Sequence, residues 1–228
     1  SLQYLPNSIT NLKNLDTLNL EENYIKKLPK KIGNLKKLKY LNLELNDFTE
    51  LPKSINKLKK IEYLNISRNK ITQLPSSFGN LSKLKILDAE FCLLNKLPKS
   101  FGKLKNLEKL ILTNNNLQSL SKNFGNLKSL KTLYLQNRTY YDFVFNRNFT
   151  KDTTITLKIL TNNLTRLPNS FSDLPNLNFL ELSFNKNIDE NNLFTILKKS
   201  KFKKYRIDLE SCNIKELPIS GWNSIKVS

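Results

Sequence analysis

The chain has 228 residues, with 38 Lys and Arg against 19 Asp and Glu, a formal net charge of +19, no His, no Met, two Cys and five Gly. Without His there is no imidazole base and the commonest metal ligand is missing, so we expect no enzyme activity, metal or cofactor. Five Gly leave little material for a phosphate-binding loop, and no apolar run approaches the roughly 20 residues of a membrane span.

A 23-residue repeat organises the chain from its N-terminus. Leu-Pro pairs begin at Leu28, Leu51, Leu74 and Leu97, and Leu5-Pro6 and Leu120-Ser121 keep the same register before and after them. Between these pairs the apolar positions follow the pattern LPxxIxxLxxLxxLxLxxNxL. This periodicity indicates stacked coils, because a coil of this size buries its leucines only against its neighbours.

In chain order, six regular coils come first, over residues 5–27, 28–50, 51–73, 74–96, 97–119 and 120–142. In each coil an alternating segment, such as residues 63–67, predicts a short strand whose leucines face inward. The xxLxxL segment before the strand predicts a turn or a short helical stretch.

Three less regular coils are expected next, over 143–166, 167–189 and 190–216, with the irregularity concentrated at 137–166 and 187–216. The spacing of Leu193, Ile196 and Leu197 predicts a helix on the outer side of the last coil. Residues 217–228 are expected to cap that coil. The whole of 1–228 is therefore predicted to be a single domain of about nine coils.

A column of polar residues follows the strands. Asn side chains stand three residues after the second strand leucine or its equivalent, at Asn23, Asn46, Asn69, Asn115, Asn162 and Asn185. A buried amide at this position can hydrogen-bond the unpaired backbone groups of the turn. Cys92 and Cys212 fall on the same column, five rungs apart in this register, so we expect two structural thiols and no disulfide.

One stretch breaks the pattern between the sixth and seventh predicted coils. Arg138 replaces the column Asn, and five aromatic residues follow, at Tyr140, Tyr141, Phe143, Phe145 and Phe149. Two interpretations stay open: the aromatic side chains fill a distorted core, or they form a projecting recognition surface. Core filling is favoured, because five exposed aromatic residues would promote aggregation.

The repeat resembles the leucine-rich repeat family in its 23-residue form, common in bacterial proteins. The resemblance implies an α/β solenoid, a horseshoe with a parallel β-sheet on the concave face and loops, 3-10 helices or short helices on the convex face. It also implies a non-enzymatic protein-protein interaction module that binds a protein or peptide on the concave face. Bacterial repeat proteins of this kind are often suspected of acting at the cell surface or on host proteins, so a secreted or cell-surface location is favoured over a cytoplasmic one.

The concave face is expected to consist of four outward positions per coil, beside and after the strand leucines. Over nine coils these 36 positions hold eight acids and four bases, net −4, which leaves +23 on the rest of the chain. Aromatic anchors among polar groups are typical of protein interfaces. The predicted binding residues are Tyr40, Glu44, Tyr63, Asp88, Glu90, Phe91, Tyr134, Phe179, Glu181, Phe184 and Asp208.

Columns of lysines just before the strands offer an alternative site. Lys36, Lys37, Lys59 and Lys60 begin these columns, which could make the protein an adhesin for polyanions or for anionic membrane surfaces. The alternative interpretation is a solvated face in a Lys-rich composition, which we favour. No nucleic-acid-binding motif accompanies the lysines, so we expect no nucleic-acid partner. The oligomeric state stays open.

Overall fold

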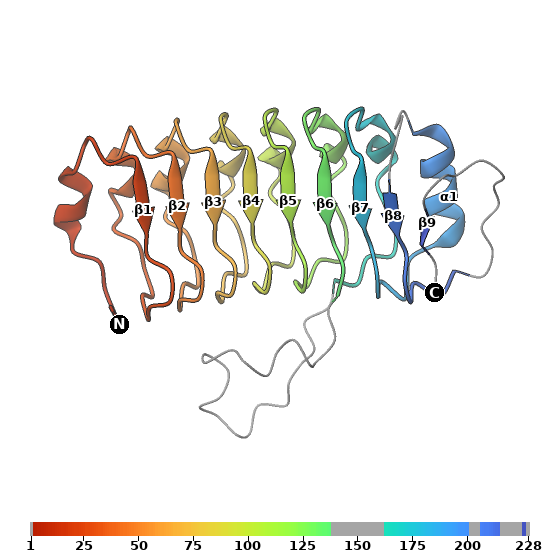
Figure 1. Cartoon of the computed structure of the whole chain (residues 1–228), viewed down its shortest axis with the longest axis horizontal. Helices are drawn as coiled ribbons and strands as arrows, with labels where there is room; N and C mark the ends of the chain where they lie inside the picture. The colour runs from red at the N-terminus through yellow and green to blue at the C-terminus, as the bar shows by residue number, and fades with distance from the viewer. Residues whose placement is uncertain (1, 138–161, 201–205, 215–224, 227–228) are drawn as a thin grey trace, which may run out of the picture.

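The computed structural model describes residues 2–137, 162–200, 206–214 and 225–226. Its core element is one parallel sheet of nine strands that follow each other in chain order (Figure 1). The strands are β1 (Thr17–Asn19), β2 (Tyr40–Asn42), β3 (Tyr63–Asn65), β4 (Ile86–Asp88), β5 (Lys109–Ile111), β6 (Thr132–Tyr134), β7 (Phe179–Glu181), β8 (Arg206–Asp208) and β9 (Ile225–Lys226). Neighbouring strands pair without a shift of register, so equivalent repeat positions form straight columns across the sheet.

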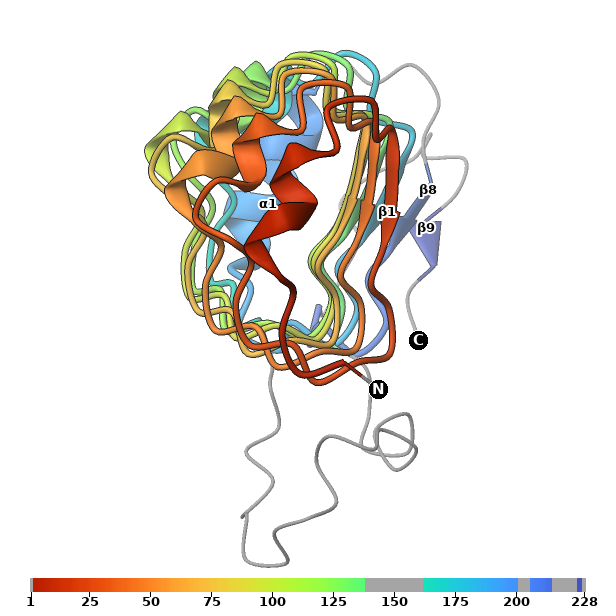
Figure 2. The same ribbon diagram turned by 90° about the vertical axis from the view of Figure 1, so that its left-hand side faces the viewer.

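Helical turns form the opposite side of each coil, as the view along the solenoid shows (Figure 2). Most are short 3-10 helices that follow the Leu-Pro corner, which suits a segment with apolar side chains three residues apart. The helices are η1 (Asn7–Asn11), η2 (Ile32–Asn34), η3 (Lys53–Lys57), η4 (Phe78–Asn80), η5 (Lys99–Lys103), η6 (Phe124–Asn126), η9 (Asn169–Asp173) and α1 (Glu190–Lys199). This is the solenoid predicted from the repeat, with strands on one face and helical turns on the other.

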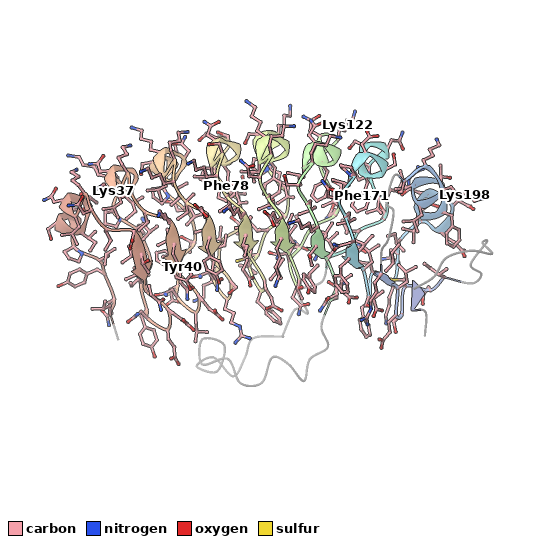
Figure 3. The ribbon with its side chains drawn as sticks, turned by 45° about the horizontal axis from the view of Figure 1, so that its top comes forward. Lys37, Tyr40, Phe78, Lys122, Phe171 and Lys198 are labelled. Carbon is pink, nitrogen blue, oxygen red and sulfur yellow. The ribbon has the colours of Figure 1, made fainter. Side chains whose placement is uncertain are left out.

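The core between these two sides is a stack of equivalent side chains. Phe78 and Phe101, from adjacent coils, stack with their ring centroids 6.2 Å apart and their planes 3° from parallel. Phe124 and Phe171 form the same pair further along, at 5.8 Å and 6°. Figure 3 shows Phe78 and Phe171 between the helical turns and the sheet. Coils pack so closely here that a Cβ on Gly79 would lie 1.8 Å from the carbonyl oxygen of Ser100.

The predicted column of buried polar residues is confirmed. The Asn69 side chain donates hydrogen bonds to the carbonyls of Leu43, Ile66 and Ser67 at 2.9–3.0 Å and accepts one from the amide of Phe48 at 3.0 Å. One side chain thus ties two adjacent coils together.

The two cysteines fill the same column, as predicted. The thiol of Cys92 donates to the carbonyl of Ile66 at 3.2 Å, and that of Cys212 donates to Leu182 at 3.1 Å. Both are free thiols, and four rungs separate them instead of the five expected, because the sheet has one rung fewer between them.

The coil predicted over 143–166 is wrong as a rung of the sheet. β6 pairs directly with β7, Thr132 opposite Phe179, so no strand lies between them. Asn162 completes the sixth coil: its side chain donates to the carbonyls of Leu112 and Leu135 at 2.8 and 3.3 Å. It occupies the column position that the repeat assigned to Arg138. Residues 138–161, with the five aromatic residues, lie outside the described part of the chain.

The C-terminal helix is confirmed on the same side as the 3-10 helices (Figure 2). The Asp189 side chain caps α1 by accepting a hydrogen bond from the amide of Asn192 at 3.0 Å, and Leu193, Ile196 and Leu197 are buried, as their spacing predicts. Of the expected cap at 217–228, the structure describes Ile225–Lys226, which pairs with β8 as strand β9.

Candidate functional site

The concave face is built from four columns of residues on the outer side of the sheet. In β2, Leu41 is fully buried, whereas Tyr40 before it points outward, and Glu44 and Leu45 follow the second buried leucine. The fourth column consists of the second residue after the second strand leucine, such as Leu45 in the coil of β2. In seven of the eight coils that contain β1 to β8, this residue has a left-handed backbone with φ between 48° and 63°, for example at Arg68 and Phe184. This turn at the end of each strand, which the repeat pattern gave no means of predicting, sets the edge of the face.

The structure places nine of the eleven predicted binding residues half-buried on this face. They are Tyr40, Glu44, Tyr63, Asp88, Glu90, Tyr134, Phe179, Glu181 and Phe184. The other two, Phe91 and Asp208, are buried, with 4% and 6% of their surface exposed. Phe91 was expected to be an exposed anchor; instead it takes the left-handed conformation with φ 48°, and the guanidinium of Arg68 covers its ring.

The charge of the face is more negative than the nine-coil register suggested. Positions 156, 158, 160 and 161, assigned to a seventh rung, have no place in the sheet between β6 and β7. The remaining 32 positions carry eight acids and three bases, net −5, so the rest of the chain carries +24. The acids are Glu21, Glu22, Glu44, Asp88, Glu90, Glu181, Asp208 and Glu210, and the bases are Arg68, Lys109 and Arg206.

Aromatic side chains pair across adjacent rungs. Tyr40 and Tyr63 stack face to face, with ring centroids 4.4 Å apart and planes 4° from parallel. Tyr134 and Phe179 meet at 5.1 Å with a tilt of 48°. The pairing of β2 with β3 places Tyr40 directly opposite Tyr63, whereas Tyr134 lies opposite Glu181 and reaches Phe179 diagonally across the pair of β6 and β7. The result is two aromatic pairs on a face that also carries charged and polar side chains.

Cations of the protein itself cover several of these rings. The Lys109 ammonium lies 5.6 Å from the ring centroid of Tyr134, and the Arg206 guanidinium lies 5.9 Å from that of Phe179. Arg68 is placed in the same way over Phe91, at 5.9 Å. Each distance is within the range of an attractive cation–π contact.

Carboxylates near the N-terminal end are held by asparagines of the next rung. The Asn42 side chain donates to Glu21 Oε2 and the Asn65 side chain to Glu44 Oε2, both at 2.9 Å. Burial raises the pKa of Glu44, and the charges of Glu21 and Asp88 add to this, although Asn65 and Arg68 act in the opposite direction.

Tyr63 belongs to the same cluster of side chains. Burial raises its pKa to about 12, with contributions from Tyr40 and from the charge of Asp88. Asp88 stands on β4, the strand next to Tyr63, and its charge acts on both Tyr63 and Glu44, so these side chains occupy neighbouring rungs of one face.

A second carboxylate cluster lies near the C-terminal end. The Ser183 hydroxyl lies within hydrogen-bond distance of Glu181 on its own coil and of Asp208 on the next. Burial raises the pKa of Glu181. Within the described residues, no group of three or more Cys, Asp and Glu side chains is placed to hold a metal ion. A hollow of about 630 Å³ lies elsewhere, between Leu120 and Pro168.

The lysine columns project from the helical side, as Lys37, Lys122 and Lys198 show in Figure 3. Several of them join neighbouring coils. Lys59 donates to the carbonyl of Asn80 at 3.0 Å, and Lys37 donates to the Asn14 side chain at 2.8 Å. Lys36 and Lys60 are exposed. A structural role therefore accounts for part of the basic flank.

Sequence reasoning missed a column of alternating charge just before the strands. It runs Asp16, Lys39, Glu62, Lys85, Glu108 and Lys131, one residue per coil. Lys85 pairs with Glu62 at 2.8 Å, and Lys131 pairs with Glu108 at 2.7 Å. The 23-residue spacing of these opposite charges was a signal that could have revealed it.

In a comparison with known protein families, residues 30–167 match the profile described as "Leucine-rich repeat region", which is more than half of the chain. The chain belongs to the leucine-rich repeat family. Comparison with curated proteins gives no match. The confirmed fold class is therefore the leucine-rich repeat solenoid, with its parallel sheet on the concave face.

Solved structures support this assignment. A leucine-rich repeat protein of Leptospira interrogans is 29% identical, with a TM-score of 0.70, and the match covers 99% of this chain and 53% of that one. Internalin C2 of Listeria monocytogenes is 21% identical (TM-score 0.67), over 90% of this chain and 76% of that one. This chain thus spans about half the length of the Leptospira protein.

A third similar structure comes from a plant. The ectodomain of the Arabidopsis thaliana receptor kinase GASSHO1/SCHENGEN3, in complex with CASPARIAN STRIP INTEGRITY FACTOR 2, is 22% identical (TM-score 0.56), over 92% of this chain and 26% of that one.

Among the described residues, no helix is long and apolar enough to cross a membrane.

Proposed function

We propose that this leucine-rich repeat protein is a non-enzymatic interaction module that binds a protein or peptide on its concave face. The observation that carries the proposal is the pairing of aromatic side chains on that face, Tyr40 with Tyr63 and Tyr134 with Phe179, surrounded by polar and charged groups. Rigid aromatic anchors within a polar surround are the side chains that protein interfaces use for most of their binding energy.

The family and the fold support this function. The Arabidopsis ectodomain with this fold is in complex with a named factor, and leucine-rich repeat proteins are interaction modules as a class. Catalysis is not part of the proposal, because the carboxylate clusters of the concave face stand on an open parallel sheet and the chain has no His to act as a base. A role at a bacterial surface or on host proteins stays part of this proposal.

A random peptide library displayed on phage tests the proposal, because selection from it requires no identified partner. Peptides selected on the wild-type protein are expected to lose at least ten-fold in affinity for the variant Tyr40→Ala/Tyr63→Ala/Tyr134→Ala, because the aromatic anchors are removed. Phe91 is kept, since it is buried and its loss would disturb the fold.

The matched control removes the basic flank through Lys36→Ala/Lys37→Ala/Lys59→Ala/Lys60→Ala. Selected peptides should bind this control with unchanged affinity. If they bind the tyrosine variant normally and fail on the lysine variant, the concave face is not the site, and the alternative of a polyanion or anionic-surface adhesin takes its place. Circular dichroism of both variants confirms that they are folded.

A further inference from the structure

The acidic charge of the concave face is concentrated at one end. The four coils that contain β1 to β4 place five acids and one base on the face, net −4, whereas the coils of β5 to β8 place three acids and two bases there, net −1. All residues outside the 32 positions of the face carry +24 in total. A partner that approaches this end therefore meets a local potential opposite in sign to that of the whole molecule.

The aromatic pairs at the two ends of the face also differ in the charged side chains around them. Tyr134 and Phe179 have cations of this protein over their rings, Lys109 and Arg206. Within the described residues, no Lys or Arg lies over the rings of Tyr40 or Tyr63. Asp88 and Glu44 stand near this stack instead, and Asp88 acts on both Tyr63 and Glu44. The N-terminal patch thus has no Lys or Arg over its rings, although Arg68 forms an ion pair with Glu44, with Nε 3.6 Å from Oε1.

We propose that the patch formed by Tyr40, Tyr63, Glu21, Glu44 and Asp88 binds a Lys- or Arg-bearing extended segment of the protein partner. The proposal rests on the concave face being the binding surface. Basic side chains of the partner lie between the carboxylates and against the tyrosine rings. Their contact with the rings is of the kind that Lys109 makes with Tyr134 and Arg206 makes with Phe179 on the same face. Charge complementarity selects this partner over an acidic or apolar one.

The state of the carboxylates fits this occupant. Glu44 is half-buried, and its pKa is raised although Asn65 and Arg68 already interact with it. Burial and the nearby charges of Glu21 and Asp88 therefore disfavour the ionised form of Glu44. An incoming cation would offset that unfavourable interaction, and sites of this kind cluster where proteins bind ligands.

Two synthetic probes test the inference. They are fluorescein-labelled twelve-residue peptides in which Lys alternates with Thr or Glu alternates with Thr, so that an extended peptide presents one kind of charge on each side. Fluorescence anisotropy should show the Lys peptide binding, although the protein has a net charge of +19, and the Glu peptide not competing for its site.

The variant Glu21→Gln/Glu44→Gln keeps a hydrogen-bond acceptor for Asn42 and Asn65 and should weaken binding of the Lys peptide about ten-fold. The matched control Glu62→Gln/Glu108→Gln makes the same change of net charge on the column before the strands. It should alter the affinity by less than about two-fold, because those carboxylates lie outside the patch.

Failure of the Lys peptide to bind, preferential binding of the Glu peptide, or an equal effect of both double variants overturns the inference. The phage-display experiment distinguishes failure of the basic-partner inference from failure of the proposed function. Peptides that depend on Tyr40 and Tyr63 but lack Lys and Arg would overturn the basic partner and leave the concave interaction site intact.

Discussion

At the scale of single residues, the fold depends on buried amides that replace the backbone partners missing at each turn. Asn69 is 3% exposed, and its four hydrogen bonds join its own coil to the preceding one. Buried polar groups left without partners cost about 1–3 kcal/mol each, so such a residue stabilises the solenoid more than an ordinary surface contact does.

Replacement of this side chain should therefore be severe. Asn69→Ala leaves the amide of Phe48 unpaired and removes one donor from each of three carbonyls, so it should lower the free energy of unfolding by about 3 kcal/mol, measured in urea. Asn69→Cys should lose less, because Cys92 fills the same column with one hydrogen bond. The exposed Asn80→Ala should change stability by less than about 0.5 kcal/mol. Equal losses for Asn69→Ala and Asn80→Ala would contradict this role.

A single carboxylate on the concave face should oppose folding at neutral pH. Because the pKa of Glu44 is raised in the folded protein, its ionisation favours the unfolded chain once the pH exceeds about 4.5. Glu44→Gln should match or exceed the wild type in free energy of unfolding at pH 7. The difference in free energy of unfolding should disappear below pH 4.5, where Glu44 becomes protonated in the folded and in the unfolded chain. Urea unfolding across this pH range measures the effect.

Glu62→Gln is the control, because the expected sign is opposite. A hydrogen bond and the charge of Lys85 lower the pKa of Glu62, so its ionised form favours the folded state above pH 4.5 and this contribution disappears as the pH falls through the lowered value. A gain of stability for Glu62→Gln at pH 7, or a loss for Glu44→Gln, would contradict the assigned environments.

At the scale of elements, the repeat register could be predicted for residues 5–137, including the strands, the helical turns and the Asn column, because one apolar pattern determines all of them. The sequence misled at residues 138–161. This stretch has 24 residues, one more than a repeat, so it looked like a degenerate coil although Asn162 continues the sixth coil. The Leu-Pro pair at Leu167 stands 47 residues after Leu120, which is one residue more than two repeats of 23. This mismatch was the signal in the sequence that residues 138–161 are an insertion into a coil.

The candidate site was predictable to the same extent. Alternation along the strands identified which residues face outward, and nine of the eleven chosen side chains lie half-buried on the face. Burial of Phe91 was not predictable, since it depends on a left-handed turn and on Arg68 from the neighbouring coil. The pairing of rings with cations depends in the same way on side-chain positions that periodicity does not specify.

Removal of residues 138–161, with Asn137 joined to Asn162, tests the corrected register. The amide of Asn162 already donates to the Asn137 side chain at 2.6 Å, so the two ends lie side by side. The shortened chain has regular 23-residue spacing and should keep its free energy of unfolding within about 1 kcal/mol and its dependence on urea unchanged.

Removal of the regular coil 74–96 is the control for this deletion. It takes one rung out of the sheet, buries less surface and should lower the urea dependence and the stability together. If removal of 138–161 behaved like removal of 74–96, the direct pairing of β6 with β7 would be wrong.

At the scale of the whole molecule, the solenoid separates charge. A net charge of −5 on the concave face stands against +24 on all other residues together, so the basic composition comes from residues outside this face. Lysines such as Lys59 and Lys37 are used in part to join coils. The face most suited to binding is consequently the one that net charge alone misrepresents.

Site-specific photocrosslinking tests the central claim, recognition on the concave face, most directly. Benzoylphenylalanine is placed at Ile86, next to Tyr63 on the face, or at the exposed Lys60, and each protein is irradiated with a peptide selected by display. The account predicts crosslinks from position 86 that free peptide competes away, and none from position 60. Crosslinks from position 60 without any from position 86 would contradict it.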